Sequence, residues 1–190
     1  MTKVRSVRRR TAATPPLIDP IDAWFTSRGW TPLAFQREVW EAYARGESGL
    51  IHAATGTGKT YAAWLGPVAE ALHEAATATG SMTSFTNTAE RPARAKPAQS
   101  PRPSIRNAAD KLRVLWITPL RALAADTERA LLEPVHAFGL PWTVESRTGD
   151  TKASLRQKQR DRLPTALVTT PESLTLLLCR PDHAELFSNL

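Results

Sequence analysis

Short apolar runs alternate along this chain with longer segments of helical periodicity. This alternation predicts strands and helices in turn. Short apolar runs, typical of strands buried in a parallel sheet, occur at 49–53, 113–118, 142–146 and 165–170. The segments that follow them predict helices, of which the third is largely polar, at 60–75, 119–138, 151–162 and 171–179. Strands that alternate with helices predict parallel βαβ units, so the fold class is α/β with a parallel sheet flanked by helices.

Two further helices are predicted ahead of the first strand. Asp19 and Asp22 are suited to capping a short helix that runs through Ser27. Residues 33–46 are amphipathic, and Gly46 stands where a C-cap glycine belongs.

Residues 77–110 interrupt this pattern. The segment is rich in Thr, Ala, Ser and Pro and has no apolar period, so it cannot bury enough surface to offset its ordering entropy. We expect a disordered insertion within one domain at 17–190, because the βα alternation continues on both sides. Residues 1–16 are expected to form a basic disordered tail.

Composition narrows the setting of the protein. The longest apolar stretches are far shorter than the ~20 residues of a membrane span, so no membrane partner is expected. The single cysteine, Cys179, excludes an intramolecular disulfide and favours a cytoplasmic location, and the four histidines show no metal-ligand spacing.

The net charge of +7 is unevenly distributed. Residues 1–16 hold five basic and no acidic side chains, and 77–110 hold five basic and two acidic ones. Basicity is therefore expected in the tail and the insertion rather than as a broad surface of the folded part. The tail would serve either as a solvated arm or as a non-specific attraction for nucleic acid.

The sequence "AATGTGKT", residues 53–60, has the spacing of a phosphate-binding P-loop with alanine in place of the first glycine. Its predicted position between a strand and a helix is the context in which such a loop binds polyphosphate. Lys59 would reach the β- and γ-phosphates of ATP as a catalytic residue, and the Thr60 hydroxyl would ligate Mg²⁺. The residues expected to bind the nucleotide here are Thr55, Gly56, Thr57, Gly58, Lys59 and Thr60.

Upstream of the P-loop, Pro32 and Gln36 in "GWTPLAFQREVW" resemble the Q motif of superfamily 2 helicases. The resemblance implies that the Gln36 amide reads the adenine edge; the alternative is a surface glutamine on a helix. Trp24, Phe25 and Trp30 are candidates for stacking on adenine, although packing between helices explains each of them better.

Three motifs downstream follow the same order as in that superfamily. "TPLRALAAD" from Thr118, "RTGDT" from Arg147 and "TTPESL" from Thr169 resemble its motifs Ia, Ib and Ic. Each comes just after a predicted strand, at the carboxyl edge of a parallel sheet. Hydroxyls, an arginine and helix-start N–H groups suit phosphate oxygens, although Thr170 before Pro171 also reads as a helix N-cap. The nucleic-acid-binding residues implied are Pro119, Arg121, Thr148, Gly149, Thr170, Pro171 and Glu172.

Taken together, the motifs are most similar to the Lhr-type group of DEAD/DEXH-box helicases, in particular the ligase-associated bacterial DNA helicases. The resemblance implies a RecA-like ATP-binding domain, ATP and Mg²⁺ as cofactors, and translocation and unwinding of DNA in repair. It also implies single-stranded DNA or duplex DNA with a single-stranded tail as partner, with RNA as an alternative, and DNA ligase or nucleases as protein partners.

One family feature is missing from the pattern. ATP hydrolysis in this family needs an acidic pair at the end of a strand, and no predicted strand here ends in one; Glu145 is the single acid near such an end. The sequence therefore resembles the first part of a helicase, an incomplete first domain that ends before motif II. We expect it to bind ATP and nucleic acid but to hydrolyse ATP poorly alone.

Two other functions remain open from the sequence. A catalytically inactive module that binds nucleotide or nucleic acid would use the same residues. A small-molecule kinase would share the P-loop but is disfavoured by the motifs that follow it.

Overall fold

The computed structural model describes residues 19–80 and 111–190, which divide into two compact units. The predicted basic tail and residues 81–110 of the predicted insertion lie outside the described residues. None of the described helices has the length and apolarity needed to cross a lipid bilayer.

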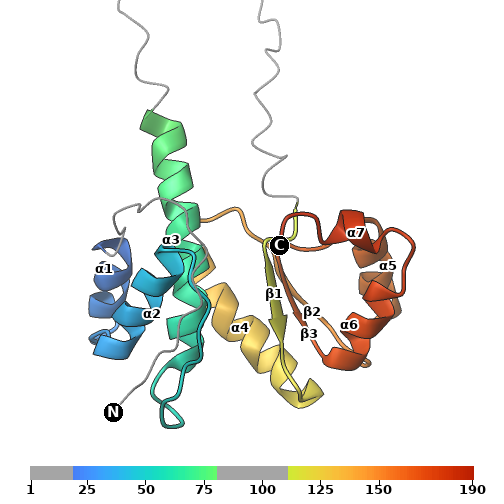
Figure 1. Cartoon of the computed structure of the whole chain (residues 1–190), viewed down its shortest axis with the longest axis horizontal. Coiled ribbons are helices and arrows are strands. Elements are labelled where there is room, and N and C mark those ends of the chain that lie inside the picture. The colour runs from blue at the N-terminus through green and yellow to red at the C-terminus, as the bar shows by residue number, and fades with distance from the viewer. Residues whose placement is uncertain (1–18, 81–110) are drawn as a thin grey trace, which may run out of the picture. The chain divides into compact units, whose positions relative to one another are not determined.

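The described part of the first unit contains three helices, α1 (Asp19–Ser27), α2 (Ala34–Ala44) and α3 (Lys59–Gly80) (Figure 1). Gly46 follows α2 with φ +68°, which confirms the predicted C-cap. Asp22 does not cap α1 but lies within it, where its carboxylate pairs with Arg37 at 2.9 Å. Helix α3 is longer than predicted and continues four residues into the segment expected to be an insertion.

Helices α2 and α3 pack through their apolar faces. Gln36 and Trp40 are the buried residues of α2, one helical turn apart, and the Trp40 indole N–H donates to the Tyr61 carbonyl of α3 at 3.2 Å. The apolar residues of α3 that face this core are Ala62, Trp64, Leu65, Val68 and Ala71.

Gly66 marks the closest approach of α3 to α2. A Cβ atom at this position would lie 2.7 Å from Cγ of the Tyr43 ring, and Tyr43 is held in place by its hydroxyl, which donates to Glu70 at 2.8 Å. Gly66→Ala should therefore lower the free energy of unfolding by about 1–2 kcal/mol, despite the better helix propensity of alanine. Urea unfolding measures this difference.

The matched background for that measurement is Tyr43→Ala, which removes the ring. There the same Gly66→Ala change should be neutral or stabilising by up to about 1 kcal/mol, since only the helix propensity remains. Equal effects of Gly66→Ala in both backgrounds would show that the ring does not limit this position.

The second unit is a three-layer α/β/α arrangement. Its strands, β1 (Val114–Ile117), β2 (Val144–Arg147) and β3 (Ala166–Thr169), form a parallel sheet in the order β1-β3-β2. Helix α4 (Arg121–Ala137) packs on one face, and the other face carries α5 (Ala153–Asp161), α6 (Pro171–Leu178) and α7 (His183–Leu186) (Figure 1). The predicted α/β class with a parallel sheet is confirmed.

The core of this unit surrounds β3, whose four residues are all buried, as expected of a central strand covered on both faces. Leu167 packs with Leu112, Leu163 and Leu177 on the α6 side. Leu131 and Val135 of α4 are also fully buried.

The predicted strand at Gly49–Ala53 is wrong: residues 49–54 have no regular secondary structure, and Leu50 is 71% exposed. A strand exists only through hydrogen bonds to a neighbouring strand, and the described part of the first unit contains helices but no strand that could pair with it. The apolar run is present in the sequence, but it pairs with no strand within the described part of its own unit.

Candidate functional site

The loop at residues 53–60 has the backbone shape expected of a phosphate-binding loop. Gly56 and Gly58 adopt φ of +83° and +81°, which only glycine tolerates without strain. No hydrogen bond joins the backbone N–H groups of residues 55–58 to another residue of the described chain, and Thr55 and Gly56 are exposed. Unpaired, accessible N–H donors just ahead of the 22-residue helix α3 form an anion-binding position.

Lys59 places its charge across the mouth of this loop. Its ammonium donates to the carbonyl oxygens of Ala53 at 2.9 Å and Ala54 at 2.8 Å, and the Thr57 hydroxyl also donates to Ala54 at 2.7 Å. These bonds to neutral carbonyls are weaker than those an ammonium makes to phosphate oxygens. A polyphosphate in the loop would therefore draw Lys59 away from the carbonyls.

Gln36 connects helix α2 to the same loop. Its side chain is 3% exposed; Oε1 accepts from the Leu33 N–H at 2.8 Å, and Nε2 donates to the Gly58 carbonyl at 3.1 Å. The alternative of a surface glutamine is therefore wrong. An amide has two donors and two lone pairs, so one N–H and one lone pair remain for an adenine edge.

Burial separates the aromatic residues considered for adenine stacking. Trp24 and Phe25 are 4% and 3% exposed and contact each other edge to face at 5.4 Å, so they belong to the helical core. Trp30 is 46% exposed, with its ring centroid 6.2 Å from that of Tyr61. Of the three, Trp30 alone offers surface to a ligand.

The three downstream motifs lie side by side in the second unit. Ile117, Arg147 and Thr169, the last residues of the strands, share one level of the parallel sheet. Thr118, Thr148 and Thr170 follow them directly, and the Thr118 N–H donates to the Thr169 carbonyl at 2.9 Å. The predicted gathering of these motifs at the carboxyl edge is confirmed.

Arg121 connects two of these loops at the start of α4. Its guanidinium lies 3.6 Å from the Asp150 carboxylate, and both side chains are mostly exposed. A Cβ on Gly149 would lie 2.8 Å from Arg121 Nη1, so a larger residue here would displace the guanidinium from its present position. Arg156 of α5, which the sequence motifs did not single out, donates to the carbonyls of Gly149 and Thr151 and fixes the loop from the other side.

Not all the predicted nucleic-acid contacts are accessible. Thr148 and Thr170 are 7% and 1% exposed. The Thr148 hydroxyl accepts from the Asp150 N–H at 3.2 Å, and the Thr170 hydroxyl lies 3.3 Å from that of Ser173. We expect these two threonines to shape the loops, which leaves five exposed candidates: Pro119, Arg121, Gly149, Pro171 and Glu172.

Glu172 occupies the start of helix α6. The pKa of its carboxyl is lowered, first by a hydrogen bond from its own backbone N–H, then by the Thr170 hydroxyl, and also by the charge of Arg121. Thr170 has the extended backbone of an N-cap, with Pro171 next, but its hydroxyl makes no cap bond to the helix backbone. An acidic residue in the first turn also suits the positive end of the helix dipole.

Acidic residues do not form a catalytic pair in the described chain. Glu145 of β2 accepts a hydrogen bond from the buried Gln159 amide at 2.9 Å, and the described strands are followed by threonines. No group of three or more His, Cys, Asp or Glu within residues 19–80 and 111–190 could hold a metal ion. The Thr60 hydroxyl, at the start of α3, fits a magnesium ion held mainly by nucleotide phosphates.

Comparisons with known proteins agree with this arrangement. The family model described as DEAD/DEAH box helicase matches residues 33–190. "Lhr helicase/ probable uracil glycosylase" of Mycolicibacterium smegmatis is 33% identical over 165 residues, which cover 82% of this chain and 9% of that protein. "ATP-dependent helicase Lhr-Core" of Methanocaldococcus jannaschii is 29% identical over 181 residues, covering 90% of this chain and 18% of that protein.

Solved structures give the same result. The Mycobacterium smegmatis helicase Lhr bound to ssDNA and AMP-PNP superposes with a TM-score of 0.62 at 28% identity, over 88% of this chain and 18% of that one. The DUF1998 helicase MrfA bound to DNA and AMPPNP shares the fold, with a TM-score of 0.58 at 21% identity over 98% of this chain and 22% of that one. This chain thus spans less than a quarter of the length of the relatives it matches.

Proposed function

We propose that this chain, which belongs to the DEAD/DEAH box helicase family, is the ATP-binding and DNA-binding part of an Lhr-type ATP-dependent DNA helicase. Residues 55–60 bind the triphosphate, with Gln36 beside the adenine. The strand-end loops of the second unit bind a DNA strand by its phosphates. RNA presents the same phosphates and is the alternative partner.

The observation that supports nucleotide binding most strongly is the combination of open N–H donors and a lysine at one helix start. The donors of residues 55–58 have no partner within the described chain, and Lys59 is restrained only by neutral carbonyl oxygens. Thr60 supplies the hydroxyl for Mg²⁺. An ATP–magnesium complex satisfies all of these groups at once.

Hydrolysis requires more than this arrangement supplies. A carboxylate pair must hold the magnesium ion and orient the attacking water, and the described strands do not end in one. We therefore propose that the chain by itself binds ATP without efficient turnover. We assign translocation, unwinding and a role in DNA repair, with ligase or nuclease partners, to a whole helicase. We propose that this helicase acts in the bacterial cytoplasm, where the DNA is.

A module that binds nucleotide and DNA without hydrolysis is the second candidate, and the missing carboxylate pair favours it. ATPase activity of the chain, measured with and without single-stranded DNA, tests the weak turnover that both candidates predict, and efficient activity that rises with DNA would contradict both. Reading the gene past the codon for Leu190 separates the two: an apolar strand that ends in Asp-Glu supports the helicase part, whereas unrelated sequence supports the module.

Binding of single-stranded DNA tests the nucleic-acid half of the proposal. Arg121→Gln should weaken binding of an oligothymidylate about fivefold, because a phosphate contact is worth about 1 kcal/mol. The slope of log affinity against log salt should become shallower by about 0.7, the value for one lost phosphate contact on a single strand. Fluorescence anisotropy over a series of salt concentrations measures both quantities.

Arg129→Gln is the matched control, since Arg129 lies on the same helix and pairs with Asp126 at 3.5 Å, much as Arg121 pairs with Asp150. It should leave affinity and slope close to those of the parent chain. Equal losses from both variants, or a strong preference for one base sequence, would contradict backbone binding at the strand-end loops.

A further inference from the structure

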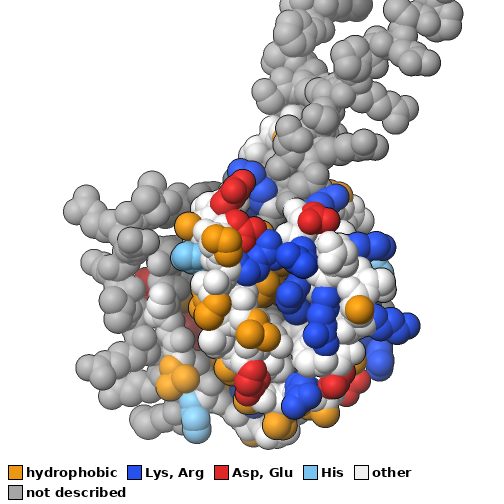
Figure 2. Space-filling model, turned by 90° about the vertical axis from the view of Figure 1, so that its right-hand side faces the viewer, with side chains coloured by type: hydrophobic (Ala, Val, Ile, Leu, Met, Phe, Trp, Pro, Cys, Tyr) orange, Lys and Arg blue, Asp and Glu red, His pale blue; other side chains and the backbone are white. Residues whose placement is uncertain are grey.

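Basic side chains are concentrated on one face of the second unit. Residues 147–162 contain six arginines and lysines but only two aspartates, and lysine and arginine gather on the face that carries α5, α6 and α7 (Figure 2). The expectation that basicity is confined to the tail and the insertion is therefore wrong. The folded part is nearly neutral as a whole, but its charge is polarised.

A pocket of about 610 Å³ opens within this face. It lies where the end of β2, the end of α5 and the connection between α6 and α7 meet, so its three arginines come from distant parts of the chain. One carboxylate accompanies them. The lining residues are Arg147, Arg160, Leu176, Arg180, Pro181 and Asp182.

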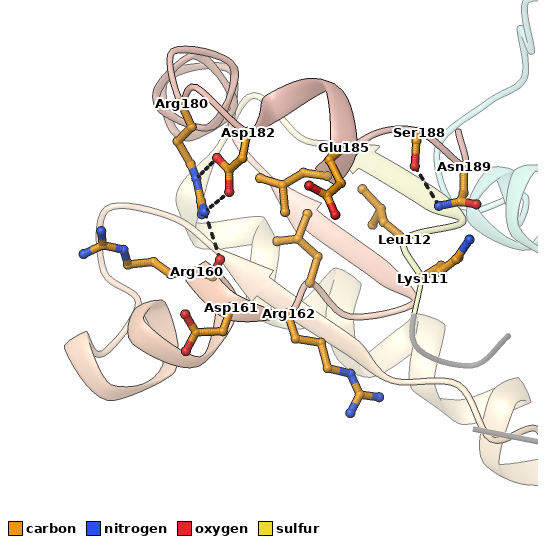
Figure 3. Close-up of a pocket in the computed structure, with 12 residues that line it drawn as sticks. Lys111, Leu112, Arg160, Asp161, Arg162, Arg180, Asp182, Glu185, Ser188 and Asn189 are labelled. Atoms are coloured by element: carbon orange, nitrogen blue, oxygen red, sulfur yellow. Dashed lines mark hydrogen bonds and ion pairs between the residues drawn. The ribbon is translucent and has the colours of Figure 1, made fainter. Parts of the chain in front are cut away.

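The carboxylate in the pocket, that of Asp182, is already paired with Arg180. Arg180 binds Asp182 through two hydrogen bonds, at 2.8 Å from Nε and 2.5 Å from Nη2, and Nη2 also donates to the Arg160 carbonyl at 2.9 Å (Figure 3). The residues of this clamp also line a second pocket, to which Arg162 contributes and Arg147 does not. Arg180 Nη1 is buried and has no hydrogen-bond partner in the described chain.

Arg147 carries uncompensated charge into the same space. Burial lowers the pKa of its guanidinium, and three neighbouring positive charges lower it further. These charges belong to Arg180, Arg156 and Arg160. Within the described chain the Arg147 guanidinium makes one hydrogen bond, a long one of 3.5 Å to the Arg156 carbonyl, so a bound anion would relieve this repulsion and satisfy the guanidinium.

The position of the pocket indicates which anion it receives. Arg147 directly precedes the Thr148–Gly149 loop, and Arg156 reaches from α5 to the carbonyls of Gly149 and Thr151. A chain of arginines thus leads from the strand-end loops to the pocket. A nucleic-acid strand bound at those loops would place a second phosphate of the same strand in the pocket. A free anion would have no such link between the loops and the pocket.

We propose that the pocket formed by Arg147, Arg160 and Arg180 binds a phosphodiester group of the nucleic-acid strand, beyond the strand-end loops. The inference rests on the proposed DNA binding and adds Arg160 and Arg180, which lie outside the sequence motifs, to Arg147, the first residue of the motif at 147–151. It predicts a longer footprint on the strand than the loops alone would give.

The test compares Arg160→Gln with Arg162→Gln in the full chain. Arg160 keeps its backbone carbonyl in the variant, so the clamp from Arg180 is retained. Arg162 lies two residues further on and lines the second pocket but not the arginine pocket, whereas Arg160 lines both. Arg160→Gln should weaken binding of an oligothymidylate about fivefold and make the salt slope shallower by about 0.7, with little change for Arg162→Gln. On an oligonucleotide too short to span loops and pocket, the Arg160 effect should disappear.

The outcomes separate this inference from the function it rests on. If the parent chain binds DNA and Arg121→Gln weakens it, but Arg160→Gln behaves like Arg162→Gln, the pocket is not a phosphate site and the proposed function stands. If the parent chain binds no DNA at all, both are wrong. Circular dichroism of each variant confirms that the fold is unchanged.

Discussion

Replacement of Lys59 by alanine should abolish measurable ATP binding by this chain. The ammonium is the one cation within the 53–60 loop, and it already lies across the loop mouth on the Ala53 and Ala54 carbonyls. Hydrogen bonds from an ammonium to charged phosphate oxygens contribute about 1.5–3 kcal/mol each. Loss of two of them lowers affinity by a factor of about 100 or more, which isothermal titration calorimetry with ATP and magnesium detects.

Lys158→Ala is the control for net charge, since Lys158 is exposed on α5 in the second unit. It should bind ATP as the parent chain does. Thermal unfolding of Lys59→Ala should change little, because the lost bonds to the two carbonyls are replaced by water at an accessible loop. Undiminished ATP affinity of a folded Lys59→Ala chain would falsify the assignment of the loop.

Gly58→Ala should cause the second large loss of ATP affinity, because it changes the backbone of the loop. Alanine at φ +81° costs roughly 1–2 kcal/mol in strain. Its Cβ would also lie 2.7 Å from the Gln36 amide nitrogen, so the bond from Gln36 to the Gly58 carbonyl cannot survive unchanged. We expect ATP affinity to fall about tenfold or more and the midpoint of thermal unfolding to drop.

Gly56→Ala isolates the strain from the contact. Gly56 has nearly the same φ, +83°, but a Cβ there would meet no atom within 4 Å. Its unfolding free energy should therefore fall by the strain alone, and Gly58→Ala should be less stable by a further 1 kcal/mol or so. Equal destabilisation in the two variants would mean that Gln36 does not hold the loop.

The sequence predicted correctly those elements whose local pattern of apolar residues is enough to specify the secondary structure and its burial. The run at 165–170 has an apolar centre, Ala166 to Val168, and became β3, buried on both faces. The motifs at 118, 148 and 170 could be placed together because parallel strands bring their carboxyl ends to one edge of a sheet.

The features that the sequence did not reveal share a physical cause, because each depends on residues that are distant along the chain. Residues 49–53 are as apolar as the other predicted strands, but a strand also needs a neighbour, which a local pattern does not reveal. Thr148 and Thr170 have suitable hydroxyls for phosphate, and their contact with nucleic acid stays a prediction, but the local pattern did not reveal that the fold buries both side chains. The arginine pocket joins positions 147, 160 and 180, and no sequence spacing relates these three.

The central claim, that the 55–60 loop encloses a triphosphate, is tested most directly by NMR on the isotope-labelled chain titrated with magnesium and a non-hydrolysable ATP analogue. The backbone amide signals of Thr55 to Thr60 should shift most, together with the side-chain amide of Gln36, and should stay unchanged in Lys59→Ala. Saturable binding that shifts signals elsewhere and leaves those amides unmoved would contradict the account.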